Sequence, residues 1–253
     1  MHSAFHSPRL RIDFAREHTE DLSAKCMEFL STRPFKDVVD IAEDGTQLLK
    51  VKLARMPPDR ISVLCAKVGE DLRSALDQTA YAVAVASGAP KPDKIHFPFG
   101  QTADDFENSI RVNCKGIHPD IVTLFREFKA YKGGDDSLYA LNELRKVSEH
   151  RMIKPVGQSI GNAIYYKNLT VRGGQVDTLA PVWNLETNEI TIARASPGAK
   201  VTLNGTLRFF IALSDAGILT GSPAIETLQQ LTIKVDGIVA ATEAEARRIS
   251  LIP

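Results

Sequence analysis

The sequence lacks most of the features that assign a chain to a class at first sight. Its 253 residues include three cysteines, which are far apart and form no C-x-x-C pair. Neither a disulfide framework nor a cysteine metal site is indicated, and a reducing compartment is favoured. No run approaches the roughly 18 apolar residues of a membrane span, and residues 1–14 contain no apolar segment typical of a signal peptide. We therefore expect a cytoplasmic protein with no membrane partner.

An excess of charge is missing too. The 31 basic and 31 acidic residues give a formal net charge of zero, so no overall field attracts nucleic acid, and any such contact must be local. Linkers rich in proline, glycine or serine are also absent, which favours one domain that spans residues 1–253. The 43% hydrophobic and 25% charged residues are typical of a globular chain that buries a large core.

Familiar catalytic and cofactor motifs are absent as well. The chain contains no G-x-S-x-G, no P-loop, no G-x-G-x-x-G and no H-E-x-x-H. The sequence therefore points to no cofactor and no metal. It indicates the fold more clearly than the activity.

The longest helical pattern lies in residues 57–87, and we expect it to form the central helix. Its apolar residues recur every three or four positions, as on one side of a helix: Ile61, Leu64, Cys65, Val68, Leu72, Leu76, Thr79 and Val83. Pro57 and Pro58 suit a helix start, whereas Gly88 and Pro90 suit its end. The other elements are expected to pack around this helix.

Residues before and after the central helix predict an N-terminal hairpin and several further helices. A polar surface helix is expected over 13–32, with Asp13 as its N-cap. Residues 35–54 predict a hairpin that turns at Asp44-Gly45. A connector over 95–100 should contribute Phe97 and Phe99 to the core, and Thr102 should cap a short helix. Helices are expected over 119–131, ended by Gly133-Gly134, and over 136–152.

Residues 154–213 change to β-branched and aromatic runs separated by turn residues, which predicts antiparallel strands. An apolar stripe over 223–249 then predicts a long C-terminal helix. The expected class is α+β: a helical bundle around the central helix, formed by 57–152 and 223–249, with an antiparallel β layer packed on it and inserted before the last helix. The N-terminal hairpin should join or flank that layer.

The helix over 136–152 carries a basic cluster that permits two interpretations. His150 lies away from the apolar stripe, and Arg145, Lys146 and Arg151 are close to it in sequence. One interpretation is a solvated face that complements the negative end of the helix dipole. The other is a phosphate site, because arginine offers paired donors and histidine moves protons near neutral pH.

The polar side of the central helix also has two interpretations. Glu70 with Arg73, and Arg73 with Asp77, have the spacing of ion pairs within one helix. Alternatively, Asp77 reaches the later helix and orients His150 or balances Arg151.

Some of these residues carry a resemblance. The chain resembles bacterial proteins of unassigned function that contain an L-R-x-x-L-D helix and an L-N-x-x-D-K-H-R helix, and the matching residues are Arg73, Leu76, Asp77, Asn142, His150 and Arg151. The layout is also similar to HEPN domains, helical modules whose last helix bears an R-x4–6-H motif. Arg145 and His150 fit that motif. Arg11 with His18 and Arg111 with His118 also fit it, but the helical context favours Arg145 with His150.

The HEPN resemblance implies a dimeric ribonuclease that needs no metal, or a module that binds RNA or a nucleotide. His150 would take the proton of a ribose 2′-hydroxyl, and Arg145 or Arg151 would stabilise charge on the phosphate. Asn142, Asp77 and Arg73 would support the site. The alternative is a non-catalytic interaction protein that self-associates through a helical surface.

Overall fold

The computed structural model describes residues 4–150, 156–179, 183–184, 186–213 and 217–253, and of residues 145–150, 156–170 and 202–209 it describes the backbone alone. Over these residues the chain combines helices with antiparallel sheets, which confirms the predicted α+β class. None of the described helices is long and apolar enough to cross a membrane.

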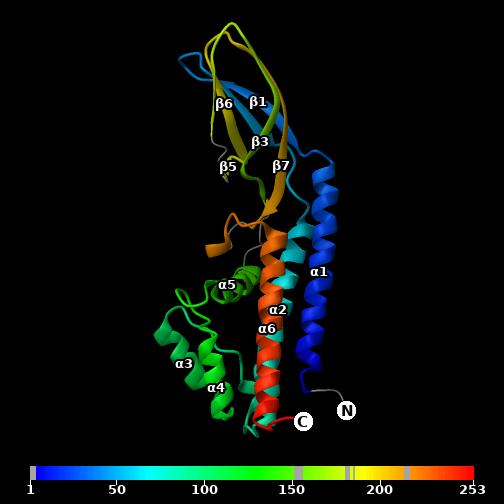
Figure 1. The fold of residues 1–253 in the computed structure, drawn as a ribbon, viewed down its shortest axis with the longest axis vertical. Coiled ribbons are helices and arrows are strands. Elements are labelled where there is room, and N and C mark those ends of the chain that lie inside the picture. The colour runs from blue at the N-terminus through cyan, green and yellow to red at the C-terminus, as the bar shows by residue number, and fades with distance from the viewer. Residues whose placement is uncertain (1–3, 151–155, 180–182, 185, 214–216) are drawn as a thin grey trace.

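Three long helices run side by side along the molecule: α1 (His6–Ser31), α2 (Asp59–Ala86) and α6 (Ala224–Arg248) (Figure 1). A shorter helix, α5 (Asp136–His150), packs against α2. The pair α3 (Ala103–Asn113) and α4 (Pro119–Glu127) lies beside the C-terminal part of α6. Two short 3-10 helices, η1 (Pro92–Lys94) and η2 (Gly217–Leu219), complete the helical part.

The central position predicted for α2 is confirmed. Its apolar stripe is fully buried, and so are small residues on its other sides, such as Ala80 and Ala84. Ala and Gly leave room for neighbouring helices to approach closely. Gly69, for example, lies opposite the Leu144 side chain of α5, which would be 3.9 Å from an added Cβ. Because α2 is apolar over most of its circumference, α1, α5 and α6 can all pack on it.

The first helix differs from the prediction. It starts at His6 rather than near residue 13, because Pro8 falls in the first turn, where a missing N–H breaks no helical hydrogen bond. Asp13 is therefore no N-cap but an interior residue that pairs with Arg16 at 2.9 Å. The helix is also more than a surface element: Ile12, Leu22 and five other residues are buried against the bundle.

The larger sheet has the strand order β1-β2-β6-β4, with β5 also paired to β6. Its strands are β1 (Phe35–Ile41), β2 (Gln47–Leu53), β4 (Val176–Thr178), β5 (Trp183–Asn184) and β6 (Glu189–Ala195). The predicted hairpin is confirmed, with a left-handed φ of 81° at Gly45 in its turn. It joins the later strands through the antiparallel pairing of β2 with β6.

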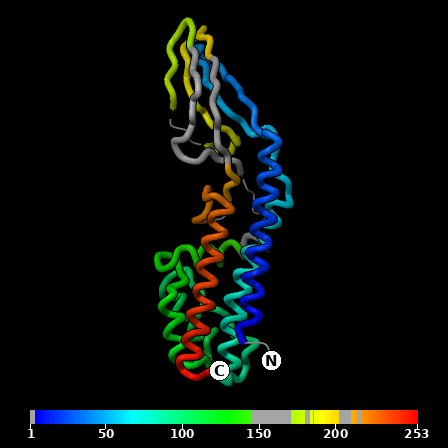
Figure 2. The backbone as a smooth tube through the Cα atoms, turned by 45° about the vertical axis from the view of Figure 1, so that its right-hand side comes forward, coloured from blue at the N-terminus to red at the C-terminus, as the bar shows by residue number. Residues whose placement is uncertain are grey.

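A second, two-stranded ribbon consists of β3 (Val156–Arg172) and β7 (Lys200–Ala212). We expected the strands to form one layer on a face of the bundle, and they do not. Both sheets extend beyond one end of the helices (Figure 1), and Figure 2 shows the same position for the larger sheet. Helices α1, α5 and α6 already cover most of α2, and the strands lie at the end of the bundle.

The connections around α3 and α4 agree with the sequence in part. Thr102 and Asp105 form the predicted capping box, and Phe97 is buried. Phe99 is only partly buried. Helix α4 ends at Glu127, not near 131, because the chain turns at Lys129 with φ of 49° and then pairs Tyr131 with Gly100.

The three cysteine thiols are buried, so their reactivity tests whether the core is packed as described. Cys26, Cys65 and Cys114 are at most 4% exposed, and burial raises the pKa of each to about 12. Because the thiolate is the reactive form, we expect none of them to react with a thiol reagent at pH 8 until the protein unfolds. An exposed cysteine introduced by Ile233→Cys should react at once and serves as the control. A native thiol that reacts as fast as this one would contradict the packing.

Candidate functional site

The predicted catalytic pair lies where the structure describes little. Arg145 and His150 belong to the last turns of α5, whose side chains are outside the described residues, and Arg151 lies outside them altogether. Asn142 is half-buried on the same helix, two residues before Leu144, which lies opposite Gly69. A site at the end of α5 therefore stays a prediction.

The other two predicted residues, Arg73 and Asp77, are brought together. Their side chains form an ion pair one turn apart on α2. The Asp77 carboxylate also accepts a hydrogen bond from the Phe97 backbone N–H at 3.0 Å, and the Arg73 guanidinium lies 4.4 Å from the centre of the Phe99 ring. This pair attaches the connector of residues 95–99 to the central helix. The within-helix interpretation of Arg73 and Asp77 is confirmed.

A different cluster lies between α1 and α2. The sequence named two of its residues, Arg11 and His18, as a motif match but not their partner Asp71. The buried carboxylate of Asp71 on α2 contacts two residues of α1. His18 Nδ1 lies 2.9 Å from Oδ2, and Arg11 donates to Oδ1 at 3.1 Å. Only 9% of the Asp71 side chain is exposed, against 27% for His18 and 43% for Arg11. The carboxylate is thus held at the base of the cluster, and the His18 and Arg11 side chains reach the surface.

The geometry constrains how the imidazole carries its proton. An ionised carboxylate can only accept hydrogen bonds, so Nδ1 must be the protonated nitrogen when His18 is neutral. The lone pair is then on Nε2, the nitrogen farther from Asp71. Because the His18 ring is partly exposed, a bound molecule could reach that nitrogen. The arrangement is therefore able to accept a proton from a ligand.

A signal for this cluster was present in the sequence. Arg11 and His18 are seven residues apart, so on a helix they differ by only about 20° and share a face. The sequence interpretation noted this motif match but set it aside, because the helix was expected to start near residue 13, which leaves Arg11 outside it. Asp71 follows Glu70 at the edge of the apolar stripe, and only the packing of α1 beside it selects it as the partner.

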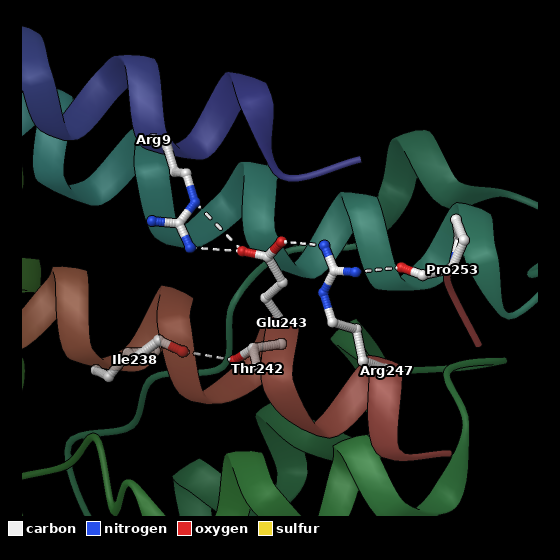
Figure 3. Close-up of polar contacts among 6 residues, drawn as sticks. All are labelled: Arg9, Ile238, Thr242, Glu243, Arg247 and Pro253. Atoms are coloured by element: carbon white, nitrogen blue, oxygen red, sulfur yellow. Dashed lines mark hydrogen bonds and ion pairs between the residues drawn. The ribbon is translucent and has the colours of Figure 1, made fainter. Parts of the chain in front are cut away.

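Helix α1 also makes ion pairs with α6, and the main one is shown in Figure 3. Arg9 donates from Nε and Nη2 to one oxygen of Glu243, at 3.2 and 2.6 Å. Arg247 donates to the other oxygen at 2.9 Å and also to the Pro253 carbonyl. Glu243 is only 8% exposed. This clamp joins the first turns of α1 to the end of α6.

The balance of effects at Glu243 has a clear sign. Burial by itself raises the pKa of the carboxyl, but the hydrogen bonds and charges of Arg9 and Arg247 outweigh it. The pKa of Glu243 therefore lies below its ordinary value of 4.5. The ionised carboxylate is the form that stabilises the fold.

Other features carry less chemistry. Among the described residues, no group of three or more histidine, cysteine or acidic side chains is arranged to hold a metal ion. A groove of about 490 Å³ lies between α1 and α6, and it is lined in part by the exposed side chains of Met27 and Ile233. Neither Arg11 nor His18 lines it.

In comparisons with protein-family models, with curated proteins and with solved structures, the chain matches none of them. The HEPN resemblance of the motifs is therefore neither supported nor opposed by these comparisons.

Replacing Asp77 tests the attachment of the connector. We expect Asp77→Ala to lower the free energy of unfolding by about 2–3 kcal/mol, because it removes a charged acceptor and leaves the buried Arg73 without this carboxylate. Glu70→Ala, at an exposed position two turns earlier, should change it by less than about 0.5 kcal/mol. Denaturant unfolding measures both. Equal values for the two variants would show that Asp77 has no such role.

The Glu243 clamp predicts a dependence of stability on pH. At pH 7 we expect Glu243→Gln to lower the free energy of unfolding by about 1–3 kcal/mol, because the charge-assisted hydrogen bonds are weakened. The stabilisation by Glu243 is complete above 4.5, the ordinary pKa, and is lost as the pH falls through the lower pKa of the folded state. The difference between the variant and the natural protein should therefore shrink below pH 4.5. Glu226→Gln, at an exposed position of the same helix, should show no such trend.

Proposed function

We propose that this protein binds RNA at the Arg11–Asp71–His18 cluster and cleaves its backbone without a metal ion, with His18 as the general base. The observation that carries the proposal is the convergence of Arg11 and His18 of α1 on one buried carboxylate of α2. These two residues also have the R-x4–6-H spacing that the sequence shares with HEPN domains.

The proposed chemistry follows from the properties of the three side chains. Nε2 of His18 accepts the proton of a ribose 2′-hydroxyl, and the oxygen then attacks the adjacent phosphorus. The 5′ oxygen leaves and takes a proton from water, so the products are a 2′,3′-cyclic phosphate and a 5′-hydroxyl. Asp71 keeps the imidazole in the correct tautomer and orientation.

Arg11 would supply the positive charge. A guanidinium has five N–H donors, and one of them is used in the bond to Asp71. The remaining donors can reach the phosphate oxygens, where negative charge grows in the transition state. A local contact of this kind suits a chain whose formal net charge is zero.

The pair Arg145 and His150 remains a second candidate for the same reaction. Residues five apart on a helix diverge by about 140°, so that pair needs either a bend or a second molecule to act on one phosphate. Arg11 and His18 need neither, since both reach one carboxylate. This difference favours the cluster on α1.

A purely structural role for the Asp71 cluster, within the non-catalytic alternative, is supported by a specific observation as well. Arg9 and Arg16 of α1 also form ion pairs, with Glu243 and Asp236 of α6. The Asp71 contacts could belong to the same set, which would hold α1 in place without any reaction. Stability and cleavage must therefore be measured on the same variants.

We expect the natural protein to cleave single-stranded RNA in the presence of a chelator, and His18→Ala to reduce the rate by about 100-fold or more, as for the loss of a general base. Arg11→Ala should reduce it as well. Fluorescently labelled RNA measures the cleavage. His96→Ala, which removes an exposed histidine, is the matched control and should leave the rate unchanged.

Two results would count against the site. If the natural protein neither cleaves RNA nor binds it, the proposed function is wrong. If His150→Ala or Arg145→Ala abolishes cleavage while His18→Ala does not, the site is at α5 instead. A thermal unfolding curve for each variant separates loss of chemistry from loss of fold, and a His18→Ala protein that is destabilised but fully active supports the structural role.

A further inference from the structure

Strand β1 is the edge of the larger sheet. It pairs with β2 on one side, and in the part of the chain that the structure describes no strand pairs with its other side. Its two large exposed aliphatic side chains are Val39 at 54% and Ile41 at 74%. An open edge that carries apolar side chains offers a template for another strand.

The ladder shows which backbone groups are open. Just beyond the two ends of β1, Ala42 donates to Thr46 at 2.8 Å, and Pro34 accepts from Ala54 at 2.7 Å. In an antiparallel pair, residues alternate between pointing their N–H and C=O toward the partner and away from it. Lys36, Val38 and Asp40 therefore bond to β2, whereas Asp37, Val39 and Ile41 present their backbone groups to the open edge.

The two faces of the strand differ in character. Val39 is paired with Leu49 and Asp37 with Val51, and both of these β2 residues are buried, so the odd-numbered residues lie on the apolar face of the sheet. The even-numbered residues lie on the polar face, where Lys50 forms ion pairs with Asp40 at 2.7 Å and with Glu189 at 2.8 Å.

We propose that the open edge of β1 pairs with β1 of a second copy of this chain, antiparallel and with a two-fold axis at Val38. In this register Asp37 and Val39 exchange backbone hydrogen bonds with Val39 and Asp37 of the second copy. Ile41 then lies opposite Phe35 of that copy, so an exposed aliphatic side chain meets an aromatic one. The two sheets become one continuous sheet.

Charge complementarity is what selects a second copy as the partner, in this register. Lys36 lies directly opposite Asp40 of the second copy, and Asp40 lies opposite its Lys36. Both are non-hydrogen-bonded pairs, in which opposing side chains are closest, so unlike charges there contribute most. The sequence of β1, FKDVVDI, thus has the self-complementary pattern that a two-fold interface requires.

The interface is small, so the dimer should be weak and its formation should depend on concentration. It is also independent of the proposed RNA site, because Arg11, His18 and Asp71 belong to α1 and α2 and none of them lies on β1. Failure of one proposal therefore leaves the other unaffected.

Sedimentation equilibrium over a range of concentrations tests the pairing. We expect the natural protein to dimerise reversibly and Val39→Pro to stay monomeric at the same concentrations with its melting temperature little changed, because proline removes an N–H that points to the open edge. Val38→Pro is the matched control: its lost N–H bonds to β2, so it should lower the melting temperature. A monomeric natural protein, or a dimer that survives Val39→Pro, would overturn the proposal.

A charge exchange tests the register. Lys36→Asp alone and Asp40→Lys alone each place like charges opposite one another, so each variant should be monomeric. Mixed together, they form opposite-charge pairs at both positions, and the dimer should return as a heterodimer. Dimers of either variant alone, or no recovery on mixing two folded variants, would contradict this register.

Discussion

The structure depends on the burial of most of the surface of α2. A helix with one apolar stripe needs one neighbour, but α2 adds small apolar residues outside the stripe, such as Ala80 and Ala84, and these are also fully buried. Three helices must cover it, and they come from distant parts of the chain: α1 precedes it, α5 follows, and α6 ends the sequence. Everything else is attached to this packing or lies at its end.

Polar groups inside the bundle determine how the helices align. The buried threonines Thr19, Thr79, Thr232 and Thr242 each donate to the carbonyl four residues earlier in their own helix, so they need no partner elsewhere. The buried carboxylates of Asp71 and Glu243 cannot do this, since they only accept hydrogen bonds. Asp71 takes its donors from α1, and Glu243 takes donors from Arg9 of α1 and from Arg247 of its own helix. The bonds to α1 set its position along α2 and α6.

The same bonds create the candidate site. A buried carboxylate without a partner costs free energy, so the fold places Arg11 and His18 beside Asp71. The same bonds that hold α1 against α2 also orient the imidazole. An oriented imidazole is the first requirement of a general base, so a structural role and a chemical role are compatible. The open strand β1, in the sheet beyond the helices, offers a surface that is independent of this cluster.

The sequence by itself determined the elements whose patterns are local: the span of α2, the hairpin turn at Gly45, the capping box of Thr102 and the stripe of α6. It also determined that Arg73 and Asp77 can pair, since they are one turn apart. Only the tertiary structure decided that Asp77 binds the Phe97 backbone, that α1 is a full member of the bundle, and that the strands lie beyond its end. It likewise selected Asp71 as the partner of Arg11 and His18, 53 residues from the latter. The physical reason is that periodicity and capping depend on neighbours in sequence, whereas the partner of a buried charge depends on which helices pack beside it.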